Sequence, residues 1–359
     1  MAKALVPTVN QELMDRITLH DMRLQRLSNG TARRVRELMW KTQEDILDQL
    51  QGRLARAAKK GFDTGPVTTK RLRDLSAAYR RMAEGLMPET RALIAADAVE
   101  GAIDEAAFQG NLFAKTLPVE VEFLLPADAI LRNAALKTPF DGRVLSEWTQ
   151  KLGRDTLGKF NQQVKLGLLE GETVEQIGRR LRGTRRNGFR DGVQGWQRYE
   201  AQTLARTATA NARAVARDET YQENSDLIKA VRWSATLDTR TCLRCAALDG
   251  RQWRLTETHP QVPLHWNCRC GLLPITKSFA ELGIDAAETP VGLRYSLTGD
   301  VPADQTYGTW IKKQTASVQR EALGPRRYEL LKDGGSVGEF VNQRNRVLTL
   351  KEMKARESR

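Results

Sequence analysis

The chain has 359 residues with 57 Lys or Arg and 44 Asp or Glu, which gives a formal net charge of +13 and a pI of about 9.8. The positive charge favours a polyanionic partner, with nucleic acid preferred over a membrane surface. A content of 28% charged and 6% aromatic residues favours a helix-rich chain. No stretch approaches the roughly 18 uncharged residues that span a bilayer, and the first apolar run is too short for a secretory signal. We therefore expect no membrane partner and a reducing cytosol as the site of synthesis.

Hydrophobic spacing predicts helices in the first third of the chain. Residues 10–60 carry leucine and isoleucine at intervals of three, four and seven, and Asn29-Gly30 is expected to split this run into two helices. The glycine- and proline-containing stretch 59–69 predicts a linker. We define 1–115 as a helical N-terminal region whose pattern indicates packing alone.

A second helical segment is expected over 116–229. Its first helix follows a turn within 138–148, and Thr173 with Gln176 has the spacing of a capping box at the start of another. An alanine-rich stretch, 199–221, predicts a long helix whose small side chains permit close packing.

An arginine-rich segment, residues 178–198, lies within this region and contains seven arginines against one aspartate. Its glycines are expected to leave the arginines mobile, which suits sequence-independent contact with DNA phosphates but also suits a solvated loop. The candidate DNA-binding residues are Arg179, Arg180, Arg182, Arg185 and Arg186.

After this region, the repeat of apolar residues along the sequence changes from about 3.6 residues, typical of a helix, to 2 residues, typical of a strand. Apolar and polar residues alternate over 230–237, which predicts a half-buried strand. Asp249-Gly250 is typical of a tight hairpin turn and predicts pairing of residues 246–248 with 251–253.

The sequence as a whole predicts an α+β fold that is mostly α-helical. The helical N-terminal and middle segments precede a small β-sheet domain, 230–285, and a basic helical C-terminal tail, 286–359. A helix pair in that tail is expected to divide at Gly324-Pro325.

All four cysteines and one of the three histidines fall in a short stretch. The spacing Cys242-x2-Cys245 allows two thiolates to reach one cation, as in structural zinc sites. The remaining ligands must come from His265, Cys268 and Cys270, so five candidates compete for four positions. We expect structural Zn²⁺ here, which would make residues 230–285 a zinc-stapled β-sheet domain.

Three alternatives stand beside structural zinc. The cysteines of 242–270 could pair as disulfides, or one could be a catalytic thiol, although no second histidine is placed as its base. A zinc-containing nuclease of the HNH type would need further ligands, for which only His259, His265 and Asn267 are on offer.

The segments WSATLDTRTCLRCAALDG, PLHWNCRC and GLLPI resemble the Mu F-like minor head proteins, or head morphogenesis proteins, of tailed bacteriophages. The resemblance extends over roughly 138–359, with two departures, Val262 and Trp266, where the family has proline. The family pattern falls on Trp233, Ala235, Asp238, Arg240, Thr241, Cys242, Cys245, Leu248, Gly250, Pro263, His265, Cys268, Arg269 and Cys270.

The resemblance implies a non-catalytic minor capsid protein, made in the host bacterial cytoplasm and incorporated into the virion in few copies at or near the portal. Its implied partners are the portal protein, capsid or scaffold proteins and, without sequence preference, packaged DNA. The alternative function is a nucleic-acid-acting enzyme such as a zinc-containing nuclease. We expect no catalytic residues, because no acidic cluster accompanies the arginines and the stretch after the cysteines is too short for an appended enzyme domain.

Overall fold

The structure is a computed structural model that describes residues 9–58, 66–116, 122–283, 285 and 293–357. Long helices occupy most of the chain as far as residue 223: α1 (Val9–Ala58), α2 (Pro66–Met82), α3 (Leu86–Thr116), α4 (Asp128–Lys137), α5 (Leu145–Leu169), α6 (Val174–Arg182), the 3-10 turn η1 (Arg185–Asn187) and α7 (Val193–Glu223).

Shorter elements follow these helices: β1 (Ile228–Ser234), α8 (Leu243–Leu248), β2 (Gln252–Arg254), β3 (Gly271–Thr276), β4 (Leu293–Ser296), β5 (Gly299–Pro302), α9 (Tyr307–Lys312), α10 (Ala316–Leu323), α11 (Pro325–Lys332), η2 (Val337–Phe340) and α12 (Leu350–Glu357). Among the described residues, no helix combines the length and the apolar character that a bilayer crossing requires.

The expected break at Asn29-Gly30 is wrong, because α1 continues through both residues. A glycine inside a helix costs only about 1 kcal/mol, and Ala32 and Val35 are fully buried just beyond it. The Asn29 side chain also accepts a hydrogen bond of 2.9 Å from Nε of Arg206 on α7. Tertiary contacts therefore override the local preference for a turn.

Most of the predicted linker, residues 59–69, lies outside the described residues.

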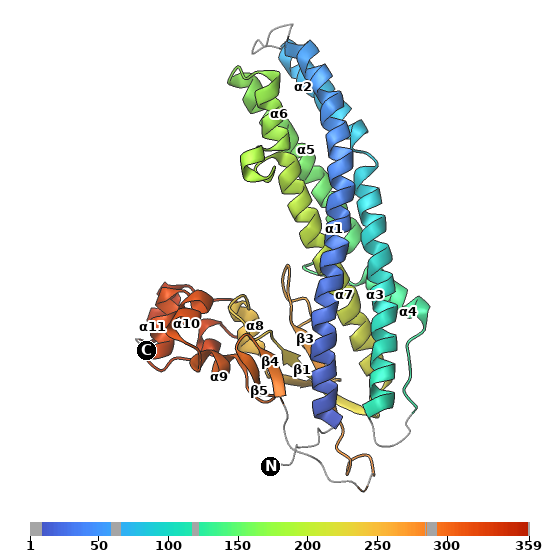
Figure 1. Cartoon of the computed structure of the whole chain (residues 1–359), viewed down its shortest axis with the longest axis vertical. Helices are drawn as coiled ribbons and strands as arrows, with labels where there is room; N and C mark the ends of the chain where they lie inside the picture. Colours follow the sequence, from blue (N-terminus) through green and yellow to red (C-terminus); the bar gives the residue numbers. More distant parts are fainter. Residues whose placement is uncertain (1–8, 59–65, 117–121, 284, 286–292, 358–359) are drawn as a thin grey trace. The chain divides into compact units, whose positions relative to one another are not determined.

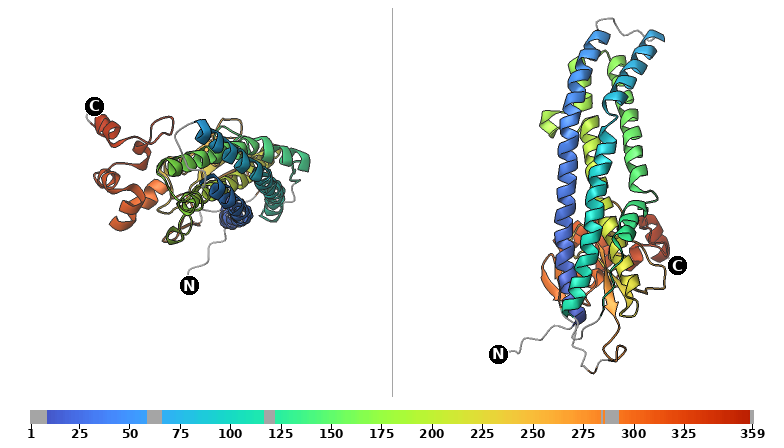
Figure 2. Two further views of the ribbon diagram at one scale, coloured as in Figure 1. Left: turned by 90° about the horizontal axis from the view of Figure 1, so that it is seen from above. Right: turned by 90° about the vertical axis from the view of Figure 1, so that its right-hand side faces the viewer.

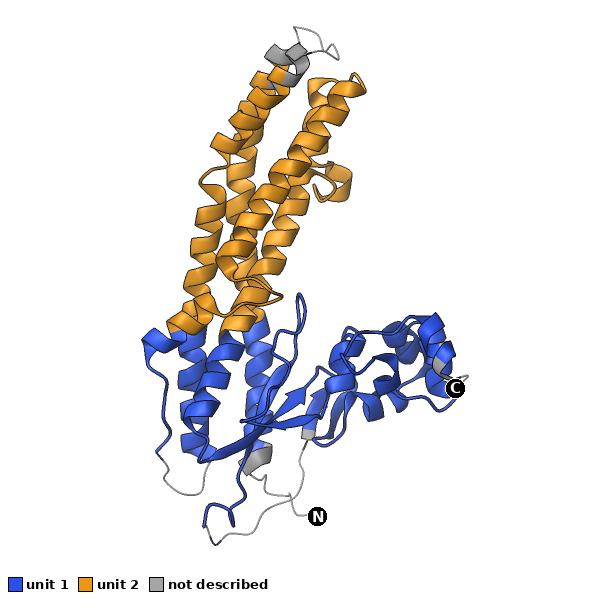
Figure 3. Cartoon of the chain, turned by 180° about the vertical axis from the view of Figure 1, so that it is seen from behind, with its two compact units in different colours: residues 1–25, 102–131, 213–359 blue, residues 26–101, 132–212 orange. Residues whose placement is uncertain are grey.

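The chain divides into two compact units, each built from segments distant in sequence (Figure 3). Unit 1 comprises residues 1–25, 102–131 and 213–359, and unit 2 comprises residues 26–101 and 132–212.

Unit 2 is helical, and its parts of α1, α3, α5 and α7 lie side by side (Figures 1 and 2). Its apolar core includes Tyr79 of α2 stacked on Phe160 of α5, with ring centroids 4.1 Å apart. The predicted capping box is confirmed: the backbone N–H of Thr173 donates to Gln176 Oε1 at 2.7 Å, and that of Gln176 donates to Thr173 Oγ1 at 3.3 Å. The predicted long helix is also confirmed, but α7 begins at Val193, before the expected start.

Unit 1 contains an antiparallel sheet of strand order β2-β1-β3. The predicted alternation is confirmed in β1 and just beyond it, where Val231, Trp233, Ala235 and Leu237 are buried and their neighbours are partly exposed. The sheet packs against the unit-1 parts of α1, α3 and α7, with Trp233 among the largest fully buried side chains.

The predicted hairpin at Asp249-Gly250 is wrong. Residues 246–248 end helix α8, and β2 pairs with β1 instead. The buried Asp249 carboxylate accepts hydrogen bonds from the backbone N–H of Ala235 at 2.7 Å and of Tyr307 at 2.6 Å. The turn is thus held by residues distant in sequence, which a local turn preference cannot reveal.

The C-terminal segment forms an apolar core with part of α8, centred on Trp310 and Phe340. The predicted division of a helix pair at Gly324-Pro325 is confirmed, since α10 ends and α11 begins there. The hairpin of β4 and β5 had no counterpart among the sequence-based expectations.

A buried ionic network joins the helices of unit 1 to β3. Arg217 of α7 donates to Asp21 of α1 at 2.6 Å and to Glu105 of α3 at 2.7 Å, and more weakly to the Leu272 carbonyl at 3.4 Å. Burial alone would raise the pKa of Glu105, but Arg217 and His20 together lower it to about 2. The network therefore holds β3, which directly follows the last cysteine, against the helices.

Candidate metal centre

The first pair of cysteines lies at the start of α8. Cys242 is the N-cap residue and Cys245 is the third residue of the helix. Side chains at these two positions face each other, as they do in a capping box. The Cys-x2-Cys spacing thus places both sulfur atoms on one side of a helical turn.

The second group of candidates lies in the loop between β2 and β3. The backbone of this loop turns back at Asn267, whose φ of 57° is left-handed, and the N–H of Cys268 donates to the His265 carbonyl at 3.1 Å. Cys270 comes directly before β3. The loop therefore presents His265, Cys268 and Cys270 from a short stretch anchored by the sheet.

The structure brings all five predicted ligands together. His265 Nε2 lies 3.1 Å from Cys242 Sγ and 3.3 Å from Cys245 Sγ, and the sulfur atoms of Cys245 and Cys268 are 3.8 Å apart. Two sets of three have their ligand atoms within 4.8 Å of one another, one of Cys242, Cys245 and His265, the other of Cys245, Cys268 and Cys270. All four cysteines are free thiols rather than disulfides.

The separation of the Cys245 and Cys268 sulfur atoms suits a tetrahedral ion. Thiolates about 2.3 Å from zinc lie roughly 3.8 Å apart, which is the separation of Cys245 and Cys268. His265 Nδ1 lies 2.9 Å from the Trp266 carbonyl, which can only accept, so Nδ1 carries the hydrogen and Nε2 is the nitrogen that faces the sulfur atoms. The donor set, the Cys245–Cys268 separation and the histidine orientation fit zinc, whereas His265 Nε2 lies closer to the Cys242 and Cys245 sulfur atoms than the roughly 3.5 Å of a tetrahedral site.

The cysteines and His265 of the cluster shift one another's pKa values. Hydrogen bonding with Cys245, and then with His265, lowers the pKa of Cys242 to about 4. Hydrogen bonding with Cys242, and then with Cys268, raises the pKa of His265 to about 10. The pKa of Cys268 is lowered, first by its hydrogen bond with Cys245. The pKa of Cys245 is raised instead, first by its hydrogen bond with Cys242, so Cys242 and Cys268 are the thiols whose deprotonation the cluster favours.

An ion pair joins the two ligand-bearing segments. Arg269 donates to Asp238 through two nitrogens, at 2.5 and 2.8 Å, and the N–H of Arg240 donates to Asp238 at 3.0 Å. Tyr307 Oη donates to the Asp238 carbonyl at 3.0 Å. Asp238 and Arg269 appear in the family pattern, but their pairing and its effect on the loops were not predicted. The sequence signal for this pair was its position: Asp238 lies four residues before Cys242, and Arg269 lies between Cys268 and Cys270.

The candidate DNA-binding arginines lie in unit 2 and fall into two groups. Arg180 pairs with Glu170 and Glu172, and Arg182 pairs with Glu44 at 2.9 Å. The other three are exposed and form no ion pair within the described part of the chain: Arg179, Arg185 and Arg186.

The glycines of this segment have a structural role that differs from the predicted one. A Cβ on Gly192 would lie 2.1 Å from the backbone nitrogen of Gly183, and a Cβ on Gly195 would lie 2.2 Å from the Phe189 carbonyl oxygen. Asp191 closes the same loop by accepting from the Thr184 N–H at 2.7 Å. The glycines therefore permit close backbone contact in a packed loop.

Residues 158–273 match the model of a family described as Phage Mu protein F like protein, which confirms the resemblance over that range. The matched residues include the arginine-rich segment and all five candidate metal ligands. Comparisons with curated proteins and with solved structures give no match.

Proposed function

We propose, from the match of residues 158–273 to the Phage Mu protein F like family, that this protein is a minor head protein of a tailed bacteriophage. The family points to phage head morphogenesis and to a structural rather than an enzymatic role. The match is the observation that carries the proposal, since it spans both candidate sites.

The finer part of the proposal places a few copies of the protein at or near the portal of the head, assembled with portal, capsid or scaffold proteins. A net charge of +13 supports residence beside packaged DNA, because a cationic surface attracts a polyanion.

The cysteine cluster would hold one structural zinc ion in this protein. The ligands with the shortest mutual contacts are Cys242, Cys245, His265 and Cys268, whereas Cys270 approaches only Cys245 and Cys268 in the sets of three. Zinc would supply cross-linking between α8 and the loop before β3, and so contribute folding free energy directly. The ion pair of Asp238 with Arg269 would orient the two ligand-bearing segments around it.

DNA binding would fall to Arg185 and Arg186, which are exposed and have no acidic partner among the described residues to displace. The logarithm of the DNA-binding constant falls linearly with the logarithm of the salt concentration. Removing one arginine that neutralises a phosphate makes the slope of this line less steep by about 0.9. We expect that change for Arg186→Ala, and a smaller one for Arg182→Ala, whose guanidinium already pairs with Glu44. Equal slopes for wild type and Arg186→Ala would contradict a role of Arg186 in DNA binding.

Mass spectrometry of purified phage particles tests the assignment itself. We expect this chain in heads and procapsids, and its co-purification with the portal oligomer when the two are expressed together. Turnover of DNA by the purified chain, abolished by His265→Ala with the fold retained, would instead support the nuclease alternative.

A further inference from the structure

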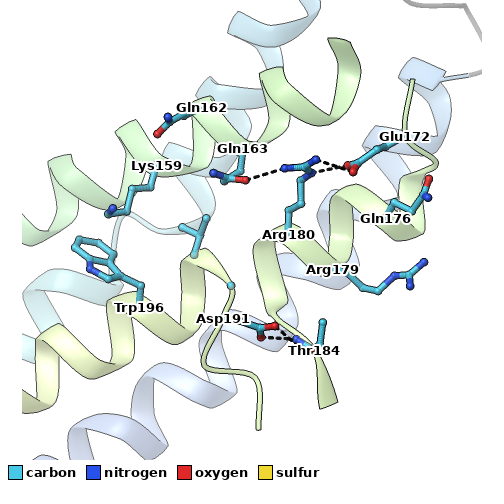
Figure 4. Close-up of a pocket in the computed structure, with 12 residues that line it drawn as sticks. Lys159, Gln162, Gln163, Glu172, Gln176, Arg179, Arg180, Thr184, Asp191 and Trp196 are labelled. Atoms are coloured by element: carbon cyan, nitrogen blue, oxygen red, sulfur yellow. Dashed lines mark hydrogen bonds and ion pairs between the residues drawn. The ribbon is translucent and has the colours of Figure 1, made fainter. Parts of the chain in front are cut away.

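A cavity of about 540 Å³ lies within unit 2, between α5, α6, the first turn of α7 and the two loops that connect these helices (Figure 4). Its volume is in the range of pockets that hold small ligands or partner side chains. The lining residues on which the argument depends are Lys159, Gln163, Glu172, Arg179, Asp191 and Trp196.

The two carboxylates of the lining are occupied by contacts within the protein. Glu172 accepts from Arg180 Nε at 2.6 Å and from its Nη2 at 2.7 Å. Asp191 accepts from the Thr184 N–H and hydroxyl, each at 2.7 Å, and from Asn187 Nδ2 at 2.8 Å. The oxygens of both acids are thus engaged within the protein, and Arg180 offsets the charge of Glu172, whereas Asp191 keeps its negative charge because its partners are neutral.

Two cations and one amide group of the lining, in contrast, do not have all their charge or donors used within the described part of the protein. Lys159 and Arg179 are exposed and form no ion pair with any described residue. Gln163 uses its oxygen to accept from Arg180 at 3.3 Å, which leaves its amide N–H groups for a ligand. The cavity thus offers donors and positive charge to a ligand that is anionic and rich in acceptors.

The position of Lys159 distinguishes between two classes of anion. Its ammonium lies over the Trp196 ring, 4.5 Å from the centroid, on a face that a stacked nucleic-acid base would need. A carboxylate can approach the same ammonium without displacing it. Carboxamides such as that of Gln163 also match the hydrogen-bonding pattern of peptide groups.

We propose that this cavity binds an acidic peptide segment of a partner protein, with a carboxylate held by Lys159 and Arg179. The inference deepens the proposed function, on which it rests for the identity of the partner as another head protein. It assigns partner binding to the cavity and DNA binding to the loop that carries Arg185 and Arg186.

The test measures binding of a fluorescein-labelled hexaglutamate peptide to the full chain by fluorescence anisotropy, with labelled oligothymidylate as a second probe. Lys159→Gln removes a charge-assisted hydrogen bond and should weaken hexaglutamate binding roughly tenfold. The matched control, Arg186→Gln, removes the same charge outside the cavity and should weaken it less than about twofold. The opposite order is expected for oligothymidylate.

Three results would overturn the proposal: no binding of hexaglutamate, equal weakening by Lys159→Gln and Arg186→Gln, or an effect of Lys159→Gln confined to oligothymidylate. Circular dichroism of both variants excludes unfolding as the cause, since both side chains are exposed. The presence of the chain in phage particles is measured separately, so failure of peptide binding leaves the head-protein assignment intact.

Discussion

The region from residue 158 of α5 to the start of α7 and the region around the cysteines are both within the matched residues, but they are held together differently. In the first, Thr173 caps its own helix and Arg180 pairs with Glu172, which is eight residues away. In the second, Cys242 meets His265 across 23 residues and Asp238 meets Arg269 across 31. The helical region thus combines local caps and ion pairs with an apolar core, such as Tyr79 on Phe160, whereas the polar contacts of the cysteine region join distant segments.

This difference predicts where the two regions are vulnerable. The helical region adds an apolar core with stacked aromatic rings, so the removal of one polar interaction leaves most of its stabilisation in place. The cysteine region joins a short helix, a loop and a three-stranded sheet through a handful of side chains. Removal of one of those side chains should therefore affect the whole region.

The largest effect is expected from Cys245→Ser, because Cys245 belongs to both sets of potential ligands. Structural zinc contributes on the order of 10 kcal/mol to the folding of small domains. We expect the variant to lose its zinc in native mass spectrometry and residues 230–280 to exchange hydrogen rapidly, while unit 2 remains protected.

Cys270→Ser is the matched control, since it removes a thiol that lies outside the proposed ligand set. It should retain one zinc per chain. Zinc retained by Cys245→Ser but lost from Cys270→Ser would show that the ligand set is different.

The next largest effect is expected from Arg217→Ala, which leaves Glu105 buried without its main partner. Breaking a buried ion pair by removing one partner costs about 3–5 kcal/mol. Urea denaturation should show this decrease in stability, and Arg346→Ala, which breaks the exposed pair with Glu352, should cost less than about 1 kcal/mol. Similar costs for the two variants would contradict the role given to the network.

Acid should weaken the same network. The pKa of Glu105 is lowered from 4.5 to about 2 in the folded protein, so its contribution is complete above pH 4.5 and is lost as the pH falls towards 2. The depression corresponds to roughly 3 kcal/mol. Urea midpoints measured across this range should fall for the wild type and change less for Glu105→Gln.

The same contrast explains how much could be predicted from the sequence. The capping box at Thr173, the alternation around Trp233 and the helix division at Gly324-Pro325 depend on neighbouring residues, and each is confirmed. The break at Asn29-Gly30 and the hairpin at Asp249 were wrong, because contacts with distant residues decide both.

In the candidate sites, too, what depends on residues close in sequence could be predicted, and what depends on contacts between distant segments could not. The clustering of cysteines marked them as joint ligands, and the structure brings their sulfur atoms together with His265. Composition marked the arginines as a group, but it could not reveal that Glu44, Glu170 and Glu172 pair with two of them, because those pairs depend on the packing of α1, α5 and α6. The cavity beside them had no sequence pattern at all, since its lining comes from three helices and the two loops between them.

The smallest effect tests whether the helical region responds locally. Thr173→Ala removes the hydroxyl that accepts from the Gln176 N–H, and the loss of such a cap costs about 1 kcal/mol. Hydrogen exchange should rise in residues 174–182 and stay unchanged around the cysteines, whereas Thr173→Ser, which keeps the hydroxyl, should resemble the wild type. The cap satisfies a donor of its own helix and nothing beyond it. A rise in hydrogen exchange in residues 230–280 of Thr173→Ala would therefore show that the two regions are coupled. The helical region would then not respond locally, as the comparison of the two regions requires.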